Sequence, residues 1–308
     1  MSRFGRSGSK PLTPLWALVL AGGNGARLSE LTTARYGYPR PKQFCALLGE
    51  QTLLEQTIVR AQLAVPSNQI MVSSRRSFRD ELPDALRQGS PIHLSEQPGN
   101  AGTTPAVLLA LTEIYARAPD ARVVILPSDH FVSDDAAFMD TVRAAALPSA
   151  PSVVLLGAQL ASPDDGLGWI EPQTPGAWVS PIARFVEKPD RAARSVLHAN
   201  GALANTFTIV GRAHALIALI GRYVPRWFEA IWQAQGNPAS LDQAYETLPA
   251  SDLSRDVLQH CANELSVMPL QGVQWSDVGT PDRLARALRQ QNDGPTTDRQ
   301  VPDHPLPL

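Results

Sequence analysis

The residue types best suited to phosphate chemistry gather in a glycine-rich loop, LAGGNGARL, at residues 20–28. Its three glycines let the backbone approach a phosphate chain closely, with N–H groups that can point at the phosphate oxygens. Arg27 adds a planar fork of donors for the same oxygens. The spacing fits neither the Gly-x-Gly-x-x-Gly dinucleotide pattern nor a P-loop, which disfavours an NAD-dependent oxidoreductase. The pattern predicts a phosphate-binding loop, with a plain tight turn as the alternative.

A second cation follows in the segment PRPKQF at residues 39–44. Its two prolines hold the chain extended, so that Lys42 is presented in a defined direction. We interpret Lys42 as a second positive charge for the phosphates. The alternative is a solvated surface lysine.

Two aspartates are suited to holding a metal ion. Asp129 follows an apolar run, Arg122–Leu126, that predicts a buried strand, and a carboxylate there can hold Mg²⁺ against phosphate oxygens. Asp277 lies in a separate loop, also after a predicted strand. The alternative for each is a turn or helix-capping aspartate. His130 could be taken for a general base, but we assign it a structural hydrogen-bonding role.

The elements that must position these residues alternate between strands and helices. Helices are predicted at Thr104–Arg117, capped by Thr104, and at Asp135–Ala146. This alternation predicts an α/β, three-layer Rossmann-like fold with a mostly parallel sheet and helices on both faces. Right-handed crossovers place the carboxyl ends of the strands on one edge, where ligands bind. The predicted strands of this part are Leu15–Leu20, Gln69–Ser73, Arg122–Leu126 and Val153–Ala158.

The later half changes character, because its strand-like pieces are short and separated by turns. We predict a small mixed-sheet lobe that carries a substrate pocket. Its strands are expected at Gly168–Pro172, Ile182–Val186 and Ala204–Val210, with a last strand near Leu265–Pro269. Helices are expected at 213–221, 225–235 and 281–289.

The bulk composition excludes several classes of partner. The 308 residues carry a net charge of only -2, so no basic field recruits nucleic acid. No apolar run approaches the roughly 20 residues that cross a bilayer. Cys45 and Cys261 lie far apart without metal-ligand spacing, which indicates a reduced cytoplasmic protein without membrane attachment. A homo-oligomer is compatible with this composition.

Five motifs in order resemble the sugar-1-phosphate nucleotidyltransferase superfamily, closest to the mannose-1-phosphate guanylyltransferases. They are the glycine loop, PKQF at 41–44, PSDH at 127–130, VEKP at 186–189 and WSDVG at 275–279. The resemblance implies one nucleotidyltransferase domain at 14–290, between a disordered leader at 1–13 and a disordered tail at 291–308. Its nucleotide half covers about 14–150 and its sugar-phosphate half about 151–290.

The activity implied by this resemblance joins an NTP to a sugar 1-phosphate, most specifically GTP to mannose 1-phosphate, and gives GDP-mannose and pyrophosphate. Mg²⁺ is the implied cofactor, held by Asp129 and Asp277. Catalytic cations are Arg27, Lys42 and Lys188. Nucleotide-binding residues are Ala21, Gly22, Gly23, Gly25, Arg27 and Thr103. Sugar-phosphate-binding residues are Gly168, Glu171, Glu187, Lys188 and Asn205; for Glu171, Glu187 and Asn205 a surface strand position is the alternative.

This reaction needs placed cations more than an acid and a base. A sugar phosphate is mostly dianionic at pH 7, since its second pKa is near 6. Like charges about 4 Å apart repel by about 4 kcal/mol per pair at an effective dielectric of about 20. Placed cations and Mg²⁺ can cancel that repulsion and hold an in-line geometry.

The sequence departs from the family pattern at base-facing and sugar-facing positions. AGTTPA at 101–106 replaces Arg-Asn-Thr-Ala-Pro-Ala, and Gln97 is an extra residue before it. ANTF at 204–207 replaces Trp-Asn-Ser-Gly, and Ala26 replaces a usual Thr. The substrates therefore stay open to dTTP or UTP with glucose 1-phosphate, to another sugar phosphate such as a heptose, or to a non-catalytic nucleotide-sugar sensor. The length leaves no room for an appended cupin isomerase domain, and no hexapeptide repeats are present.

Overall fold

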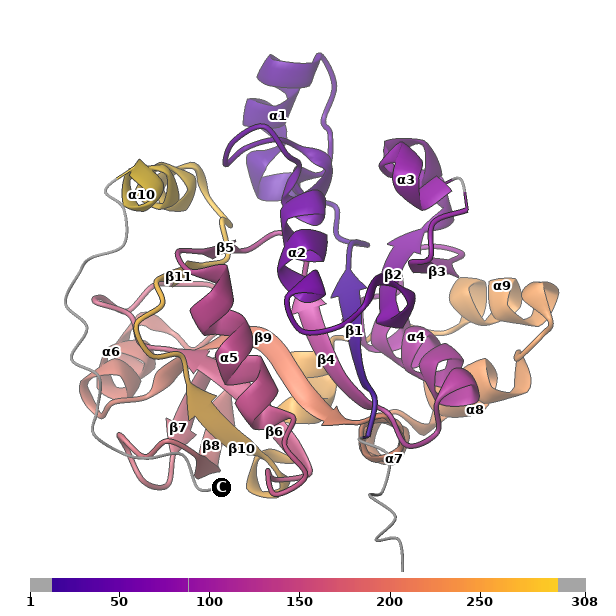
Figure 1. The fold of residues 1–308 in the computed structure, drawn as a ribbon. Coiled ribbons are helices and arrows are strands. Elements are labelled where there is room, and N and C mark those ends of the chain that lie inside the picture. The colour runs from indigo at the N-terminus through magenta and orange to yellow at the C-terminus, as the bar shows by residue number, and fades with distance from the viewer. Residues whose placement is uncertain (1–12, 88, 293–308) are drawn as a thin grey trace, which may run out of the picture.

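One nine-stranded sheet runs through the computed structural model, which describes residues 13–87 and 89–292 (Figure 1). Its strands are β1 Leu15–Leu20, β2 Ile70–Arg75, β3 His93–Gln97, β4 Arg122–Pro127, β6 Val153–Ala158, β7 Trp169–Pro172, β8 Ser180–Val186, β9 Leu203–Arg212 and β10 Ser266–Pro269. They lie in the order β3-β2-β1-β4-β9-β6-β10-β8-β7. A separate two-stranded ladder pairs β5, Phe131–Val132, with β11, Trp275–Ser276.

The α-helices are α1 Ser29–Tyr36, α2 Leu53–Gln62, α3 Asp84–Arg87, α4 Thr103–Arg117, α5 Asp135–Ala145, α6 Arg191–Ala199, α7 Ala213–Tyr223, α8 Pro225–Gln233, α9 Pro238–Thr247 and α10 Pro281–Asn292. Among the described residues, none of these helices is both long and apolar enough to span a bilayer. The predicted leader and tail fall almost entirely outside the described residues, although α10 continues through the first two positions of that tail.

The prediction of a mostly parallel sheet is correct only for the first half. There β1 pairs in parallel with β2 and β4, and β2 with β3. β9 then lies antiparallel between β4 and β6, and β7 and β8 add further antiparallel pairs. The mixed strands therefore continue the same sheet and do not form a separate lobe. Apolar runs report that a strand is buried, but they carry no information on its direction or its neighbour, which explains the difference.

Alternating strand residues face two hydrophobic clusters, so both faces of the sheet are covered. Leu18 and Val123 pack with residues of α4, α7 and α8 on one face. Ala17 and Val124 pack with residues of α2 and α5 on the other face (Figure 1). This period of two is what a doubly covered sheet requires.

The start of α4 differs from the prediction. Gly102, with φ 91°, is the N-cap, and Thr103 is the first helical residue. The hydroxyl of Thr104 accepts a hydrogen bond from Ser251 Oγ at 2.9 Å instead of capping the helix. A polar partner distant in sequence has replaced the local cap, which the local pattern could not reveal.

Candidate active site

The β5–β11 ladder brings together the two segments that contain the predicted metal ligands. β5 directly follows Asp129 and His130, and Asp277 directly follows β11. The antiparallel register pairs Ser276 with Phe131, which places Asp277 beside His130. Two aspartates 148 positions apart in sequence (277 − 129) are thus delivered to one end of a short ladder.

His130 has the structural role predicted for it. Trp275 Nε1 donates a hydrogen bond to His130 Nδ1 at 3.3 Å, and the two rings meet edge to face at 5.1 Å. Burial lowers the pKa of His130 to about 4, although the Asp129 carboxylate opposes this shift. The imidazole is therefore neutral at pH 7 and holds the ladder together as an acceptor.

Lys42 joins the two predicted metal ligands. Its Nζ lies 3.0 Å from Asp129 Oδ2 and donates to the backbone carbonyls of Asp277 at 2.7 Å and Val278 at 3.3 Å. Burial alone would raise the pKa of Asp129, but the ammonium of Lys42 and hydrogen bonds hold it below its ordinary value. The predicted cation and both aspartates therefore meet, with Asp277 contributing its carbonyl oxygen.

The Asp277 carboxylate is held by Arg283 on α10, which the sequence did not single out. Arg283 Nη1 lies 2.8 Å from each carboxylate oxygen, and the Gly279 N–H donates to Oδ1 at 3.1 Å. The Arg283 side chain is only 4% exposed and also pairs through Nε with Asp164 at 3.2 Å. The two aspartates thus have different partners, a lysine for Asp129 and a buried arginine for Asp277.

Gln43, next to Lys42, fixes the glycine loop. Its Nε2 donates to the carbonyls of Ala21 at 3.0 Å and Gly23 at 2.8 Å, and the side chain is 1% exposed. The Ala21 N–H donates to Ser73 O at 2.8 Å, so both backbone groups of Ala21 are already used by the protein. Ala21 therefore supports the loop from behind and offers no free N–H to a phosphate.

Within the glycine loop, Gly25 is the glycine whose lack of a side chain matters most. Its φ is 63°, and a Cβ at this position would lie 2.8 Å from Lys42 N. The glycine loop and the PKQF segment thus pack backbone to backbone. Only glycine meets both conditions without strain.

A cavity of about 300 Å³ lies at the carboxyl ends of β1 and β4. Four of the predicted site residues line it, namely Gly22, Gly23, Thr103 and Asp129. Its other lining residues include Ser73, Gln97, His130 and Phe207. Gln97, the extra residue of the sequence, is 3% exposed and donates to Ser73 Oγ at 3.0 Å. The Thr103 hydroxyl accepts a hydrogen bond from Leu253 N at 2.8 Å, so it supports the cavity wall.

The predicted sugar-phosphate residues form a second group. The Asn205 N–H donates to Gly168 O at 2.8 Å, and a Cβ at Gly168 would lie 2.7 Å from Glu187 Oε2. Lys188 Nζ pairs with Glu187 Oε1 at 3.0 Å. Burial raises the pKa of Glu187, and the hydrogen bond from Lys188 opposes that shift. Gly168, Glu187, Lys188 and Asn205 therefore lie together in one group.

Glu171 is not part of this group. Side chains of β7 alternate between the faces of the sheet, with Ile170 in one hydrophobic cluster and Trp169 in another. Glu171 shares the face of Trp169, and its carboxylate pairs with Arg184 Nε at 3.1 Å. Strand periodicity has turned Glu171 away from the side on which Gly168 faces Glu187.

The Arg27 side chain extends from the glycine loop to Gly166, in the segment that precedes Gly168. The side chain is exposed, and its Nη1 would be 3.5 Å from a Cβ placed on Gly166. Among the hydrogen bonds and ion pairs of the described residues, none involves the Arg27 guanidinium. Its donors therefore remain available between the glycine loop and the segment that precedes Gly168.

Backbone strain concentrates in the same region. In the described part of the chain, the non-glycine residues with positive φ are Lys188 at 46°, Phe207 at 56° and Val278 at 47°. Such conformations cost on the order of 1–3 kcal/mol each and persist where surrounding structure enforces them. Each of the three lies at the site just described, which supports a functional reason for keeping them.

The donor chemistry fits Mg²⁺. The Asp129 carboxylate and the carbonyls of Asp277 and Val278 are hard oxygen donors, and Mg²⁺ takes one or two carboxylates together with waters and substrate phosphates. Residues 13–87 and 89–292 contain no group of three or more His, Cys, Asp or Glu arranged to hold a metal.

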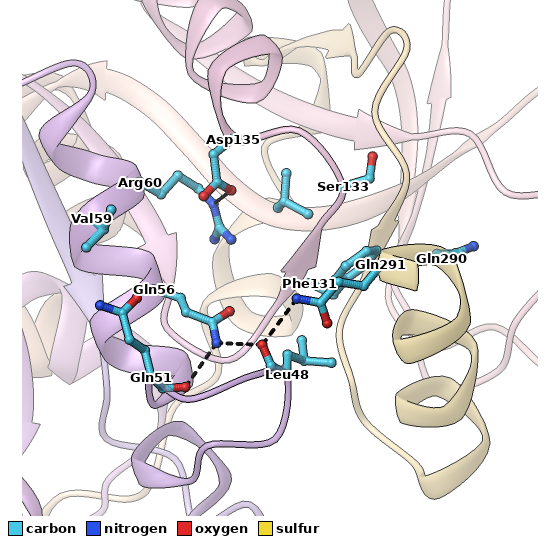
Figure 2. A pocket seen from close by; sticks show the side chains of 11 residues that line it. Leu48, Gln51, Gln56, Val59, Arg60, Phe131, Ser133, Asp135, Gln290 and Gln291 are labelled. Atoms are coloured by element: carbon cyan, nitrogen blue, oxygen red, sulfur yellow. Dashed lines mark hydrogen bonds and ion pairs between the residues drawn. The ribbon is translucent and has the colours of Figure 1, made fainter. Parts of the chain in front are cut away.

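A different cavity of about 300 Å³ is lined by Phe131 of β5 and by residues of α2 and α10 (Figure 2). Gln56 Nε2 donates there to the carbonyls of Leu48 at 3.1 Å and Gln51 at 3.0 Å, and Arg60 Nε pairs with Asp135 at 2.6 Å. None of the predicted site residues lines it. The cavity that contains Asp129 is therefore the one that matches the sequence prediction.

The chain matches the family model "Nucleotidyl transferase" over residues 16–294 and belongs to that family. It is 29% identical over 288 residues to the xanthan biosynthesis protein XanB of Xanthomonas campestris, covering 90% of this chain and 60% of the relative. It is 29% identical over 287 residues to the mannose-1-phosphate guanylyltransferase ManC of Salmonella typhimurium, covering 87% and 58%. The chain thus spans about 60% of the length of the curated relatives it matches.

A crystal structure from Thermus thermophilus, described as a mannose-1-phosphate geranyltransferase, has a TM-score of 0.76 and 28% identity. The match covers 87% of this chain and 77% of that chain. A putative glucose-1-phosphate thymidylyltransferase from Bacillus anthracis has a TM-score of 0.59 at 17% identity, which indicates a shared fold. The chain is accordingly a member of the nucleotidyltransferase family and is similar to the mannose-1-phosphate guanylyltransferases.

Proposed function

We propose that the protein transfers a nucleotidyl group from an NTP to a sugar 1-phosphate, with GTP and mannose 1-phosphate as the preferred pair. The observation that carries the proposal is one cavity lined by Gly22, Gly23 and Asp129, with Lys42 bound to that aspartate. The cluster of Gly168, Glu187 and Asn205 supports a second substrate. GTP and mannose are suggested by the ManC relative.

The chemistry is a single displacement. An oxygen of the sugar phosphate bonds to the α-phosphorus, the bond from that phosphorus to the α–β bridging oxygen breaks, and pyrophosphate leaves. No proton has to be removed from the nucleophile, because a phosphate monoester is mostly dianionic at pH 7. The low pKa of His130, about 4, makes its imidazole a poor proton acceptor at pH 7, which fits a site that uses no general base.

The residues of the chain supply orientation and charge. The N–H groups of the glycine loop and the free donors of Arg27 would bind the triphosphate, while Glu187 would accept hydrogen bonds from sugar hydroxyls. Lys188 would meet the phosphate of the sugar. Mg²⁺, when bound at Asp129, would neutralise phosphate oxygens. Crowded like charges are the main barrier, and these groups lower it.

The test is pyrophosphate release from a matrix of GTP, ATP, UTP, CTP and dTTP against mannose, glucose and heptose 1-phosphates, with MgCl₂. We expect turnover for GTP with mannose 1-phosphate and loss of turnover in Asp129→Ala. Turnover with another pair alone would reassign the substrates. No turnover with any pair, together with tight nucleotide-sugar binding, would support a sensor instead.

The two glutamates of the sugar-phosphate half provide a matched pair for the same assay. Glu187→Gln removes an acceptor beside Gly168, and we expect it to raise the KM for the sugar phosphate about tenfold. Glu171→Gln lies on the other face of β7, and we expect less than about a twofold change. Equal KM values for the two variants would contradict the assignment of the sugar site.

A further inference from the structure

The Lys42 ammonium has no donor left for a substrate. An ammonium carries three N–H donors, and Lys42 Nζ contacts three oxygens: Asp129 Oδ2 at 3.0 Å, Asp277 O at 2.7 Å and Val278 O at 3.3 Å. Its side chain is 12% exposed. Lys42 can therefore hold this cluster of oxygens or serve a phosphate, but it cannot do both at once.

The three oxygens form a site for a cation. Two are carbonyls of consecutive residues, and the second residue, Val278, has the left-handed backbone conformation that a β-branched side chain disfavours. The third is a carboxylate oxygen of Asp129, which also lines the cavity of the glycine loop. All three are hard donors of the kind that Mg²⁺ and Mn²⁺ accept.

We propose that Lys42 is the resident cation of this oxygen cluster, and that a divalent metal binds Asp129 only by displacing the ammonium, which is then free for the phosphates. The inference rests on the proposed function in one respect, that Asp129 is the metal-holding residue. A divalent ion and an ammonium repel each other at such distances, so both cannot share the cluster.

The use of lysine at this position supports an exchange. Of the 27 lysines and arginines, three are lysines, at positions 10, 42 and 188. A compact ammonium on a flexible stem can leave a site and reach another, whereas a guanidinium forms a rigid fork. The contrast lies nearby, because Arg283 pairs with Asp277 and Asp164 together and is almost completely buried.

A first experiment uses the unaltered protein. Lysine side chains are labelled with limiting acetic anhydride, and the peptides containing Lys42 and Lys188 are quantified by mass spectrometry with and without MnCl₂. We expect Mn²⁺ to raise the Lys42-to-Lys188 labelling ratio about threefold or more, because a released amine joins the accessible population. An unchanged or lower ratio would overturn the inference.

A second experiment measures Mn²⁺ affinity by electron paramagnetic resonance, without nucleotide. We expect Lys42→Met to bind Mn²⁺ about tenfold more tightly than wild type, because no ion pair has to be broken. Arg40→Met removes a nearby cation that pairs with Glu81 instead, and we expect affinity within about twofold of wild type. Asp129→Asn in the Lys42→Met background should abolish the gain.

The outcomes separate this inference from the proposed function. Equal or weaker binding by Lys42→Met overturns the exchange, even if wild type releases pyrophosphate with MgCl₂. Absence of Mn²⁺ binding by both proteins also overturns it, and removes the metal from Asp129 as well. Lys42→Gln, checked by circular dichroism, replaces the methionine variant if that variant does not fold.

Discussion

The two predicted metal ligands, Asp129 and Asp277, are held by cations that differ in side-chain type and in burial. Asp129 is 26% exposed and pairs with a lysine that is 12% exposed. Asp277 is 17% exposed and pairs with an arginine that is 4% exposed and has further acidic partners. The first pair is partly buried and its lysine is a flexible point charge, whereas the second is a more deeply buried network around a rigid guanidinium and is costly to break. We therefore expect Lys42 to leave Asp129 when a metal ion binds, and Arg283 to stay bound to Asp277.

The largest expected effect is a difference between variants of Asp129 and Asp277, measured both in activity and in stability. We expect Asp129→Asn to lower kcat about 100- to 1000-fold, because a charge at the reacting phosphates is lost. Its free energy of unfolding should change by less than about 1 kcal/mol. Asp277→Asn should instead lower the free energy of unfolding by about 1–3 kcal/mol, since a buried hydrogen-bonded partner of Arg283 loses its charge. Kinetics and urea unfolding of both variants check this, and similar stability losses would break the comparison.

The next effect concerns the cations. Arg283→Met leaves Asp277 and Asp164 without their shared counter-charge, and we expect a loss of about 3 kcal/mol in unfolding free energy. Lys42→Met should cost less, about 1–2 kcal/mol, because the oxygens that lose the ammonium are only partly buried. Denaturant unfolding measures both values. The double variant Arg283→Met/Asp277→Asn provides the control, because a coupling energy below about 0.5 kcal/mol would show that the pair contributes nothing.

The smallest effect concerns how Lys42 is placed. Gly25→Ala puts a Cβ against Lys42 N in a left-handed conformation, and we expect a loss of about 1–2 kcal/mol in stability together with reduced activity. Gly23→Ala meets nothing within 4 Å and is the matched control, with a change of about 0.5 kcal/mol or less. Thermal unfolding of both variants would show whether the backbone contact positions the lysine, and equal values would exclude it.

The sequence was informative where local chemistry determines structure. The bounds of β1 and β6 match the predicted strands, because short apolar runs between turns leave little freedom. The orientation of Glu171 could have been predicted as well, since it is three positions from Gly168 and side chains an odd number of positions apart on a strand point to opposite faces.

Other features depend on partners far along the chain. Arg283 lies in a helix with Arg286 and Arg289, where a solvent-exposed arginine is the ordinary expectation. Its burial follows from Asp164, which is 119 positions away (283 − 164) and has no motif of its own. The antiparallel insertion of β9 is likewise a pairing of distant segments, and periodicity contains no information about it.

That insertion has a consequence for synthesis on the ribosome. β9, at residues 203–212, supplies the hydrogen-bonding neighbour of both β4 and β6, which are complete by residue 158. A nascent chain that has emerged only to that point leaves one edge of β4 and both edges of β6 unpaired, because β10, the other neighbour of β6, comes later at residues 266–269. Such edges invite pairing with other chains. The interval between residues 158 and 203 is therefore when a growing polypeptide is most exposed to aggregation, and when a chaperone would protect it most.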